Sequence, residues 1–333
     1  LFAAEQSSLK TFTFRLSGEP ETMDWNLAHT MIETYLLMHL MEGLVTLESG
    51  YEVKPSLAEK WHISKDGKTY TFYLKKDVKW SDGKPLTAAD FVYSWKRLLS
   101  PVTAASYAYL LFDIVGAEDF NKGKNKDFNQ VGIKALDAHT FQVQLKNPIS
   151  HWIFIPSFWV TFPLREDIVQ KHGTSWARPG RMVTAGPFTL ISHDIDSKIV
   201  MKENPYYHGK KGNVQQVVAL IVKDDTTAMN LYQTGKLDFL TDISTLDLKR
   251  LEKRPDLKTF PYLKIGYLGF TVNKFPLNSV HVRKAIAYAI DKSQLGFVLH
   301  GGQKPATTFV PAPLLGFDPN LGLKYDPAQA KRE

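Results

Sequence analysis

The sequence predicts a mixed α/β protein with more than one domain. Its 333 residues exceed the roughly 100–200 residues of a typical single domain, so two domains or one large two-lobed body are expected. Segments that alternate apolar and polar residues, as strands do, are interspersed with segments of helical periodicity. They follow no regular βαβ pattern, and no internal repeat is visible.

The first elements carry clear local signals. Thr11–Leu16 alternates apolar and polar residues and is predicted to be a strand. A helix is predicted over Met31–Glu42, because Thr30 and Glu33 have the spacing of a capping box, in which each side chain accepts a hydrogen bond from a backbone N–H. Gly43 is expected to end this helix as a C-cap with positive φ.

A hairpin and a second capped helix follow. Thr69–Leu74 alternates again and comes after the turn Lys65-Asp66-Gly67, so it is predicted to be the second strand of a hairpin. Thr87 and Asp90 form another capping pattern, which opens a helix ending near Leu99.

The later elements are predicted from the same periodicities. Further strands are expected at Thr140–Leu145, Phe188–Ser192, Lys198–Lys202, Val217–Val222 and Ile265–Val272. Further helices are expected at Thr226–Thr234, with Gly235 as its cap, and at Ser279–Ile290 and Lys292–Leu299. Asp326 and Pro327 suit the start of another helix with few residues left to complete it, which we interpret as truncation of a longer chain.

The composition narrows the function. The chain has 44% apolar and 23% charged residues, which is typical of a globular protein with a core. Its charge of +7 is spread thinly, and the basic stretches Lys122–Lys126 and Lys210–Lys211 are expected to be solvated loops, so no nucleic-acid partner is predicted. The absence of cysteine excludes thiol catalysis and disulfides.

No catalytic pattern is present. The sequence contains no G-x-S-x-G, H-E-x-x-H, Walker or G-x-G-x-x-G motif. His29 and His39 belong to no tight cluster and are expected to be solvated or core residues, and Asp224-Asp225 is expected to cap a helix. We therefore predict no catalytic residues, no metal site, no cofactor and no enzymatic activity.

One long motif resembles a known family. Residues Ala58–Gly83 read AEKWHISKDGKTYTFYLKKDVKWSDG, which is similar to the signature of the bacterial extracellular solute-binding proteins that serve peptide importers. The oligopeptide-binding members are the most similar. Further matching segments are Pro85–Trp95 (PLTAADFVYSW), Gly186-Pro187-Phe188, Glu203–Tyr207 (ENPYY), Gly235–Asp238 (GKLD), Phe275–Asp291 (FPLNSVHVRKAIAYAID) and Tyr325–Lys331 (YDPAQAK).

This resemblance implies an α/β, two-lobed, periplasmic-binding-protein-like fold with an extra subdomain inserted in lobe one and a truncated second lobe. Residues 1–42 with 166–262 would form the core of lobe one, and 43–165 the inserted subdomain. Residues 263–274 would be a crossover or hinge strand, and 275–333 the incomplete start of lobe two.

The resemblance also implies a function. The protein would be the extracytoplasmic substrate-binding subunit of an ABC importer, capturing oligopeptides between its lobes and delivering them to a membrane permease. An extended peptide bound as an added strand would be held through its backbone. The location would be periplasmic or extracytoplasmic after removal of a signal peptide, with a lipid anchor left open.

Three segments would face the ligand by this resemblance. The first is His29-Thr30-Met31. The alternative interpretation of this segment is that it only begins the following helix and contacts no ligand. The second is Tyr107, which otherwise reads as a core aromatic residue. The third comprises Tyr267, Phe270 and Asn273 on the crossover strand. Trp80, Asp82 and Gly83, the strongest motif residues, are expected to be structural.

Other functions stay open at this point. Within the same family, the ligand could be a dipeptide, a murein peptide, a nickel chelate or an oligosaccharide. Outside it, a periplasmic peptide hydrolase is disfavoured by the missing catalytic pattern. A stand-alone interaction or sensor module is the third alternative.

Overall fold

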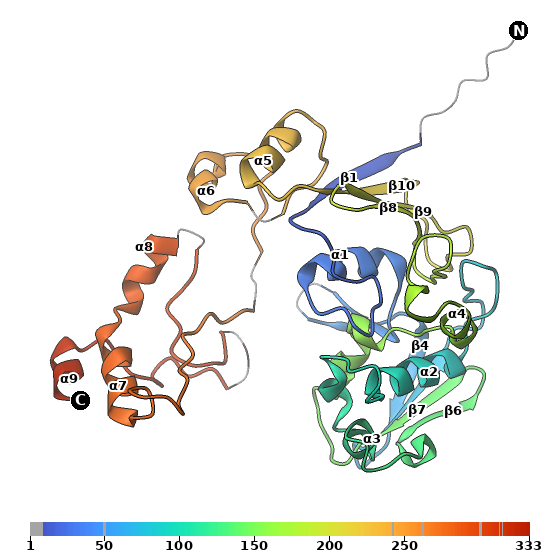
Figure 1. Cartoon of the computed structure of the whole chain (residues 1–333), viewed down its shortest axis with the longest axis horizontal. Helices are drawn as coiled ribbons and strands as arrows, with labels where there is room; N and C mark the ends of the chain where they lie inside the picture. The colour runs from blue at the N-terminus through green and yellow to red at the C-terminus, as the bar shows by residue number, and fades with distance from the viewer. Residues whose placement is uncertain are drawn as a thin grey trace, which may run out of the picture. The chain divides into compact units, whose positions relative to one another are not determined.

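The computed structural model describes residues 9–48, 51–241, 243–260, 263–299, 302–312, 314 and 316–333. The chain divides into two compact units, Leu1–Thr241 and Asp242–Glu333. Figure 1 labels many of the α-helices and strands.

The first unit contains a four-stranded mixed sheet formed by segments far apart in the sequence. Its strands β1 (Thr11–Leu16), β8 (Phe188–Asp194), β9 (Lys198–Glu203) and β10 (Gln216–Ile221) lie in the order β1-β10-β9-β8. β1 pairs in parallel with β10, and the other pairs are antiparallel. The strand predicted at Thr11–Leu16 is confirmed as β1, in which Phe14 and Leu16 are buried together with Arg15 between them.

Helix α1 (Met31–Leu40) confirms the predicted start and corrects the predicted end. The capping box is present, with Glu33 accepting a hydrogen bond from the Thr30 N–H at 2.9 Å. The helix ends at Leu40, and extended Met41 is its C-cap. The prediction of a C-cap at Gly43 is therefore wrong. A Cβ atom at Gly43 would lie 2.4 Å from the carbonyl oxygen of Pro156, so glycine is needed there for a close backbone approach.

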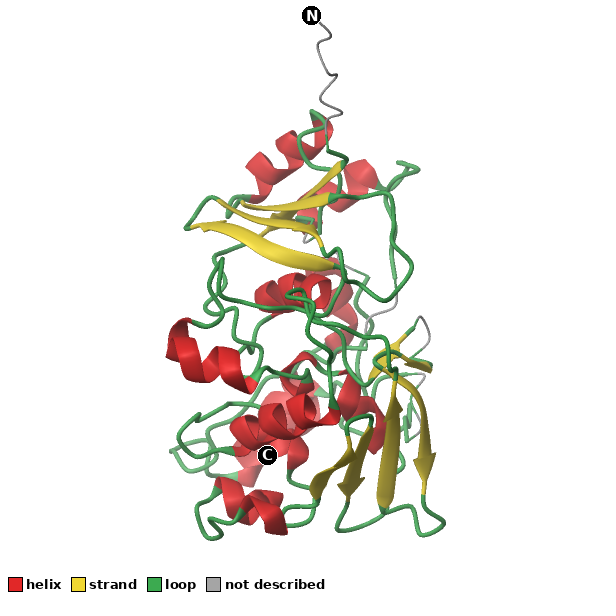
Figure 2. Cartoon of the chain, turned by 90° about the vertical axis from the view of Figure 1, so that its right-hand side faces the viewer, coloured by secondary structure: helices red, strands yellow, loops and turns green. Residues whose placement is uncertain are grey.

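A second, antiparallel sheet follows the order β4-β5-β7-β6 and stands apart from the first sheet in Figure 2. Its strands are β4 (Ala58–Ile63), β5 (Thr69–Leu74), β6 (Ile133–Asp137) and β7 (Thr140–Gln144). The predicted hairpin is confirmed as β4 and β5, with Gly67 at φ 69° in the turn. β2 (Val45–Leu47) and β3 (Val53–Pro55) form a separate small ribbon.

Aromatic side chains build the core beneath this second sheet. Helix α2 (Ala88–Leu99) packs on β6 and β7. Trp95 meets the ring of Phe141 edge-on, with centroids 5.0 Å apart, a favoured aromatic geometry. The short helices of this unit are η1 (Ala108–Leu111), α3 (Ala117–Asn121), η2 (Phe128–Gln130), η3 (Trp152–Ser157), η4 (Trp159–Thr161), α4 (Glu166–His172) and η5 (Gly173–Ser175).

Helix α5 (Asp225–Gln233) confirms another prediction. The Asp224 carboxylate accepts a hydrogen bond from the Thr227 N–H at 2.7 Å, and Gly235 follows the helix with φ 70°. The neighbouring Asp225 instead pairs with Arg15 at 2.6 Å. The acidic pair thus supports structure rather than proton transfer.

The second unit is helical in its described residues. It contains α6 (Thr245–Leu251), α7 (Val280–Ala289), η6 (Lys292–Gln294), α8 (Leu295–Leu299) and α9 (Pro327–Arg332), with α7 against α9. The predicted strand at Ile265–Val272 is wrong, since 263–274 carry no strand. A strand needs a neighbour to bond its backbone groups, and no strand occurs in the described part of this unit.

The lobe boundaries stay a prediction. The first sheet takes its strands from residues 11–16 and 188–221, whereas the second sheet takes them from 58–144. This division is compatible with a subdomain at 43–165 inserted between 1–42 and 166–262. The assignments of 263–274 and 275–333 remain expectations from the resemblance.

Candidate ligand-binding site

The loop that leaves β1 is fixed by a buried charge pair. The Oδ2 atom of Asp24 accepts hydrogen bonds from Arg97 Nη2 at 2.5 Å and from Trp176 Nε1 at 3.1 Å. Arg97 lies on α2, so the contact ties the loop to the core of the second sheet. A buried carboxylate with both a cation and an N–H donor resists displacement, because breaking the pair would strand a charge away from water.

Asn26 adds a second anchor two residues further along the loop. Its amide Nδ2 donates to the Val160 carbonyl at 2.8 Å and to Ser94 Oγ at 3.2 Å. Its Oδ1 accepts from Arg97 Nη1 at 2.9 Å. The amide is buried, and these partners come from α2 and η4, which leaves the loop little freedom.

The anchored loop meets an aromatic cluster at its end. Trp159 Nε1 donates to the Ala28 carbonyl at 3.1 Å, and the Tyr107 hydroxyl donates to the His29 carbonyl at 3.4 Å. The Tyr107 ring stands edge-on to Phe158, with centroids 5.5 Å apart. The structure therefore brings His29 and Tyr107 together, although the sequence singled them out from separate segments.

The backbone at this point offers hydrogen-bond donors. His29 and Met31 have exposed side chains, and Thr30 is half-buried as the helix N-cap. The Thr30 N–H is used by Glu33. Within the described residues, the N–H groups of His29 and Met31 have no partner. A ligand backbone could therefore bond to them without breaking a contact of the protein.

Tyr267, Phe270 and Asn273 lie in the second unit. Tyr267 is 71% exposed, and the centroid of its ring lies 5.1 Å from that of the Phe309 ring. Phe270 is half-buried and Asn273 is exposed. Contact between these residues and a ligand stays a prediction.

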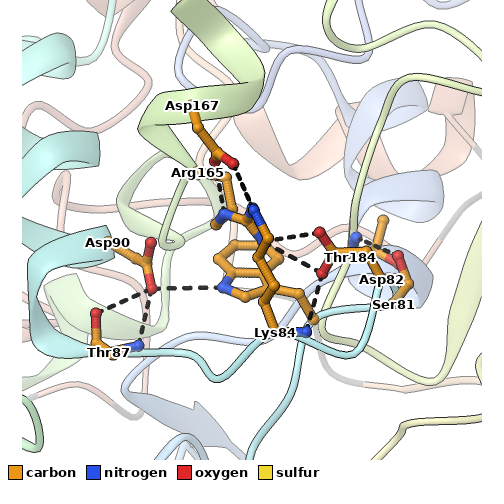
Figure 3. Close-up of polar contacts among 9 residues, drawn as sticks. Ser81, Asp82, Lys84, Thr87, Asp90, Arg165, Asp167 and Thr184 are labelled. Carbon is orange, nitrogen blue, oxygen red and sulfur yellow. Dashed lines mark hydrogen bonds and ion pairs between the residues drawn. The ribbon is translucent and has the colours of Figure 1, made fainter.

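The most recognisable motif residues build structure instead (Figure 3). Trp80 is fully buried and its Nε1 donates to Asp90 Oδ2 at 3.4 Å. Asp82 accepts from Arg165 Nη1 at 3.1 Å. Hydrogen bonds from Arg165 and then Lys84 hold the pKa of Asp167 well below its usual range, whereas burial raises the pKa of Asp90. These contacts join the turn to α2 and α4.

Sequence reasoning missed the anchors of the loop. Asp24 and Arg97 are 73 positions apart, so no local pattern links them. The only signal was that Asp24 stands between Met23 and Trp25, where a charge among large apolar residues needs a buried partner.

The described residues place limits on other chemistry. They contain no group of three or more His, Asp or Glu side chains that could hold a metal ion. Over the same part of the chain, every helix is too short or too polar to cross a bilayer.

Solved structures of similar fold define the class. The chain matches a periplasmic oligopeptide-binding protein, OppAIV of Borrelia burgdorferi, with a TM-score of 0.89 and 28% identity over 97% of this chain and 65% of that one. It matches the murein tripeptide-binding protein MppA of Escherichia coli with a TM-score of 0.87 and 30% identity over 95% and 63%. The chain shares the mixed α/β fold of these periplasmic binding proteins.

The chain belongs to the bacterial extracellular solute-binding proteins of family 5, whose middle-region model matches residues 52–333. It is 34% identical over 301 residues to the periplasmic oligopeptide-binding protein OppA of Escherichia coli, covering 88% of this chain and 55% of that protein. It is also 34% identical over 314 residues to the probable deoxycholate-binding periplasmic protein YgiS of Escherichia coli, covering 92% and 58%. The chain thus spans under two thirds of these relatives.

Proposed function

We propose that this chain is part of the substrate-binding subunit of an ABC importer and that its ligand is an oligopeptide. The observation that carries the proposal is the geometry of His29–Met31. Among the described residues the N–H groups of His29 and Met31 have no partner, and the Tyr107 hydroxyl donates to the His29 carbonyl. A carrier of many peptides has to recognise the groups that all peptides share, which are backbone N–H and C=O groups and the two termini.

Rigidity of the loop supports this role. A hydrogen-bond donor that is already fixed loses little conformational entropy when the ligand binds. A larger part of the free energy of each hydrogen bond therefore contributes to affinity. Asp24 and Asn26 hold the loop from inside the protein. Side chains of the peptide would then be accommodated through water, which bridges polar groups without strong selection.

The relatives support the same class of partner and location. Several are named as periplasmic oligopeptide-binding proteins, so we propose a membrane permease as the partner and an extracytoplasmic location. We propose no hydrolytic activity. Incubation with a mixed peptide pool should leave every peptide intact, and the appearance of shorter products would contradict this.

Native mass spectrometry tests the ligand class. The chain would be incubated with equal amounts of a dipeptide, a pentapeptide, a murein tripeptide and deoxycholate, the last two because relatives are named for them. The expected result is retention of the pentapeptide. Selective retention of deoxycholate, or of no peptide, would overturn the oligopeptide proposal.

Tyr107→Phe tests the position of the site. Loss of the hydroxyl removes the hydrogen bond that holds the His29 carbonyl, so the backbone N–H groups at His29–Met31 are less well fixed. We therefore expect pentapeptide affinity to fall about two- to tenfold, the range of one net hydrogen bond. Tyr73→Phe is the matched control, because Tyr73 lies on β5 at the surface of the second sheet. Equal affinities for the two variants would place the peptide elsewhere.

A further inference from the structure

A cavity of about 340 Å³ opens at one end of the first sheet. Phe12 of β1, Phe188 of β8 and Val217 of β10 line it. Phe12 lies opposite Val217 in the parallel pair, and all three residues stand near the start of their strands. The volume is within the range of small-molecule sites, which are typically apolar with a few polar groups.

This cavity is distinct from the candidate peptide site. None of the seven residues predicted to bind peptide lines it. It lies at the amino end of β1, whereas the loop that carries His29 leaves the strand at Leu16. A ligand in the cavity would therefore not contact His29–Met31.

His39 also lines the cavity. Its Nδ1 lies 2.6 Å from the Tyr35 carbonyl oxygen, which can only accept, so Nδ1 carries the proton. Burial lowers the pKa of His39, which favours the neutral ring. Nε2 then presents a lone pair, and it has no partner among the described residues.

A cation stands at the rim of the same cavity. Lys210 and Lys211 both line it, but Lys211 Nζ is paired with Glu203 Oε1 at 3.0 Å. Lys210 is exposed, and no ion pair with it is found in the described part of the chain. Tyr207 also lines the cavity, and its hydroxyl proton is already used, because the hydroxyl donates to Glu42 Oε1 at 2.7 Å.

We propose that this cavity is a second ligand site, which takes a small hydroxylated aromatic acid. The ring of the ligand would lie against Phe12 and Phe188, its hydroxyl would donate to His39 Nε2, and its carboxylate would face Lys210. The site is independent of peptide capture, because the two sets of lining residues do not overlap.

Three matched probes test the chemistry in ligand-observed NMR titrations. They are 4-hydroxyphenylacetate, 4-methylphenylacetate, which lacks the hydroxyl donor, and tyramine, which replaces the carboxylate with a cation. We expect the first to bind, the second to bind about tenfold more weakly because the acceptor is left unpaired, and the third to bind weakest. Equal binding of the first two would overturn the proposal.

Variants assign each contact. His39→Phe keeps the aromatic ring and removes the acceptor, so the hydroxyl and methyl probes should bind equally. Lys210→Ala should weaken binding of both acids about two- to fivefold, as expected for an exposed charge. Lys198→Ala is the matched control, since Lys198 is an exposed lysine of β9 that does not line the cavity.

Filling the cavity gives an independent test if His39→Phe does not fold. Val214 lines the cavity and is half-buried outside the strands, and Val214→Trp should abolish binding while thermal melting verifies folding. Binding that survives in folded Val214→Trp would overturn the site. An excess of pentapeptide should leave the affinity for 4-hydroxyphenylacetate unchanged, and displacement would assign the acid to the peptide site instead.

Discussion

Arg97 and Asp24 form a two-point contact inside the first unit, with Nη1–Oδ1 and Nη2–Oδ2 distances of 2.9 and 2.5 Å. Only 16% of the Arg97 side chain and 5% of the Asp24 side chain is exposed. The contact joins the loop after β1 to α2, the helix that packs on β6 and β7 of the second sheet. It therefore fixes the backbone that we assign to ligand binding, without any need to touch the ligand.

Arg97→Met should be strongly destabilising. It leaves the Asp24 carboxylate buried without its cation, which typically costs about 3–5 kcal/mol of unfolding free energy. Urea unfolding measures this cost. Lys122→Met is the control, because the exposed pair of Lys122 with Glu118 is screened by solvent and should contribute little to stability. A similar small cost for both variants would mean that water reaches Asp24.

Gly43→Ala should destabilise the protein by about 1–3 kcal/mol, the cost of overpacking. A methyl group at Gly43 would press on the Pro156 carbonyl, so the backbone would have to move. Gly212→Ala is the control, since nothing lies within 4 Å of its added Cβ and its φ is not positive. Thermal melting distinguishes the two, and a Gly43→Ala protein as stable as the control would rule out the close approach.

The elements that could be predicted from sequence are those with a local cause. The capping box at Thr30 and the alternation of Tyr70, Phe72 and Leu74 involve residues a few positions apart, and the structure confirms α1 and β5. The family signature at residues 58–83 was equally local. It identified the family and the hairpin, but it contains none of the residues assigned to the ligand.

The features that could not be predicted depend on distant partners. The apolar pattern at 265–272 suits a strand, but an isolated segment cannot satisfy its backbone there. Gly43 was given the commonest role of a glycine after a helix, whereas its real constraint is Pro156, more than a hundred residues away. The contact of Tyr107 with His29 likewise arises from packing around Trp159.

Trp80→Phe should lower stability without changing peptide affinity. The variant removes the indole N–H that Asp90 accepts inside the protein, and an acceptor left short of a partner costs about 1–3 kcal/mol. The affinity for a pentapeptide, measured well below the melting temperature, should stay within twofold. Tyr107→Phe differs in this respect, because it is expected to lower the affinity for the pentapeptide. A peptide-affinity loss in folded Trp80→Phe would mean that the motif contributes to the ligand site.

His39 should make stability depend on pH in a defined window. Because burial lowers its pKa from 6.5, the unfolded chain takes up a proton at this residue before the folded protein does. Its contribution to stability is thus complete above about pH 6.5 and declines as the pH falls toward the folded-state pKa. The charged residues that line the same cavity are Lys210, Lys211 and Glu203. The His39→Phe variant leaves all three in place, so their effect on stability is common to both proteins.

His39→Phe removes the titrating group and keeps the aromatic ring. Urea unfolding at intervals from pH 7.5 to 5 should show that the stability of the wild type falls relative to the variant as the pH decreases. His62→Phe, at an exposed position on β4, is the control and should run parallel to the wild type. A constant difference between wild type and His39→Phe across this range would show that burial does not lower the pKa of His39. The neutral ring, with Nε2 as an acceptor, would then be confined to pH values above about 6.5.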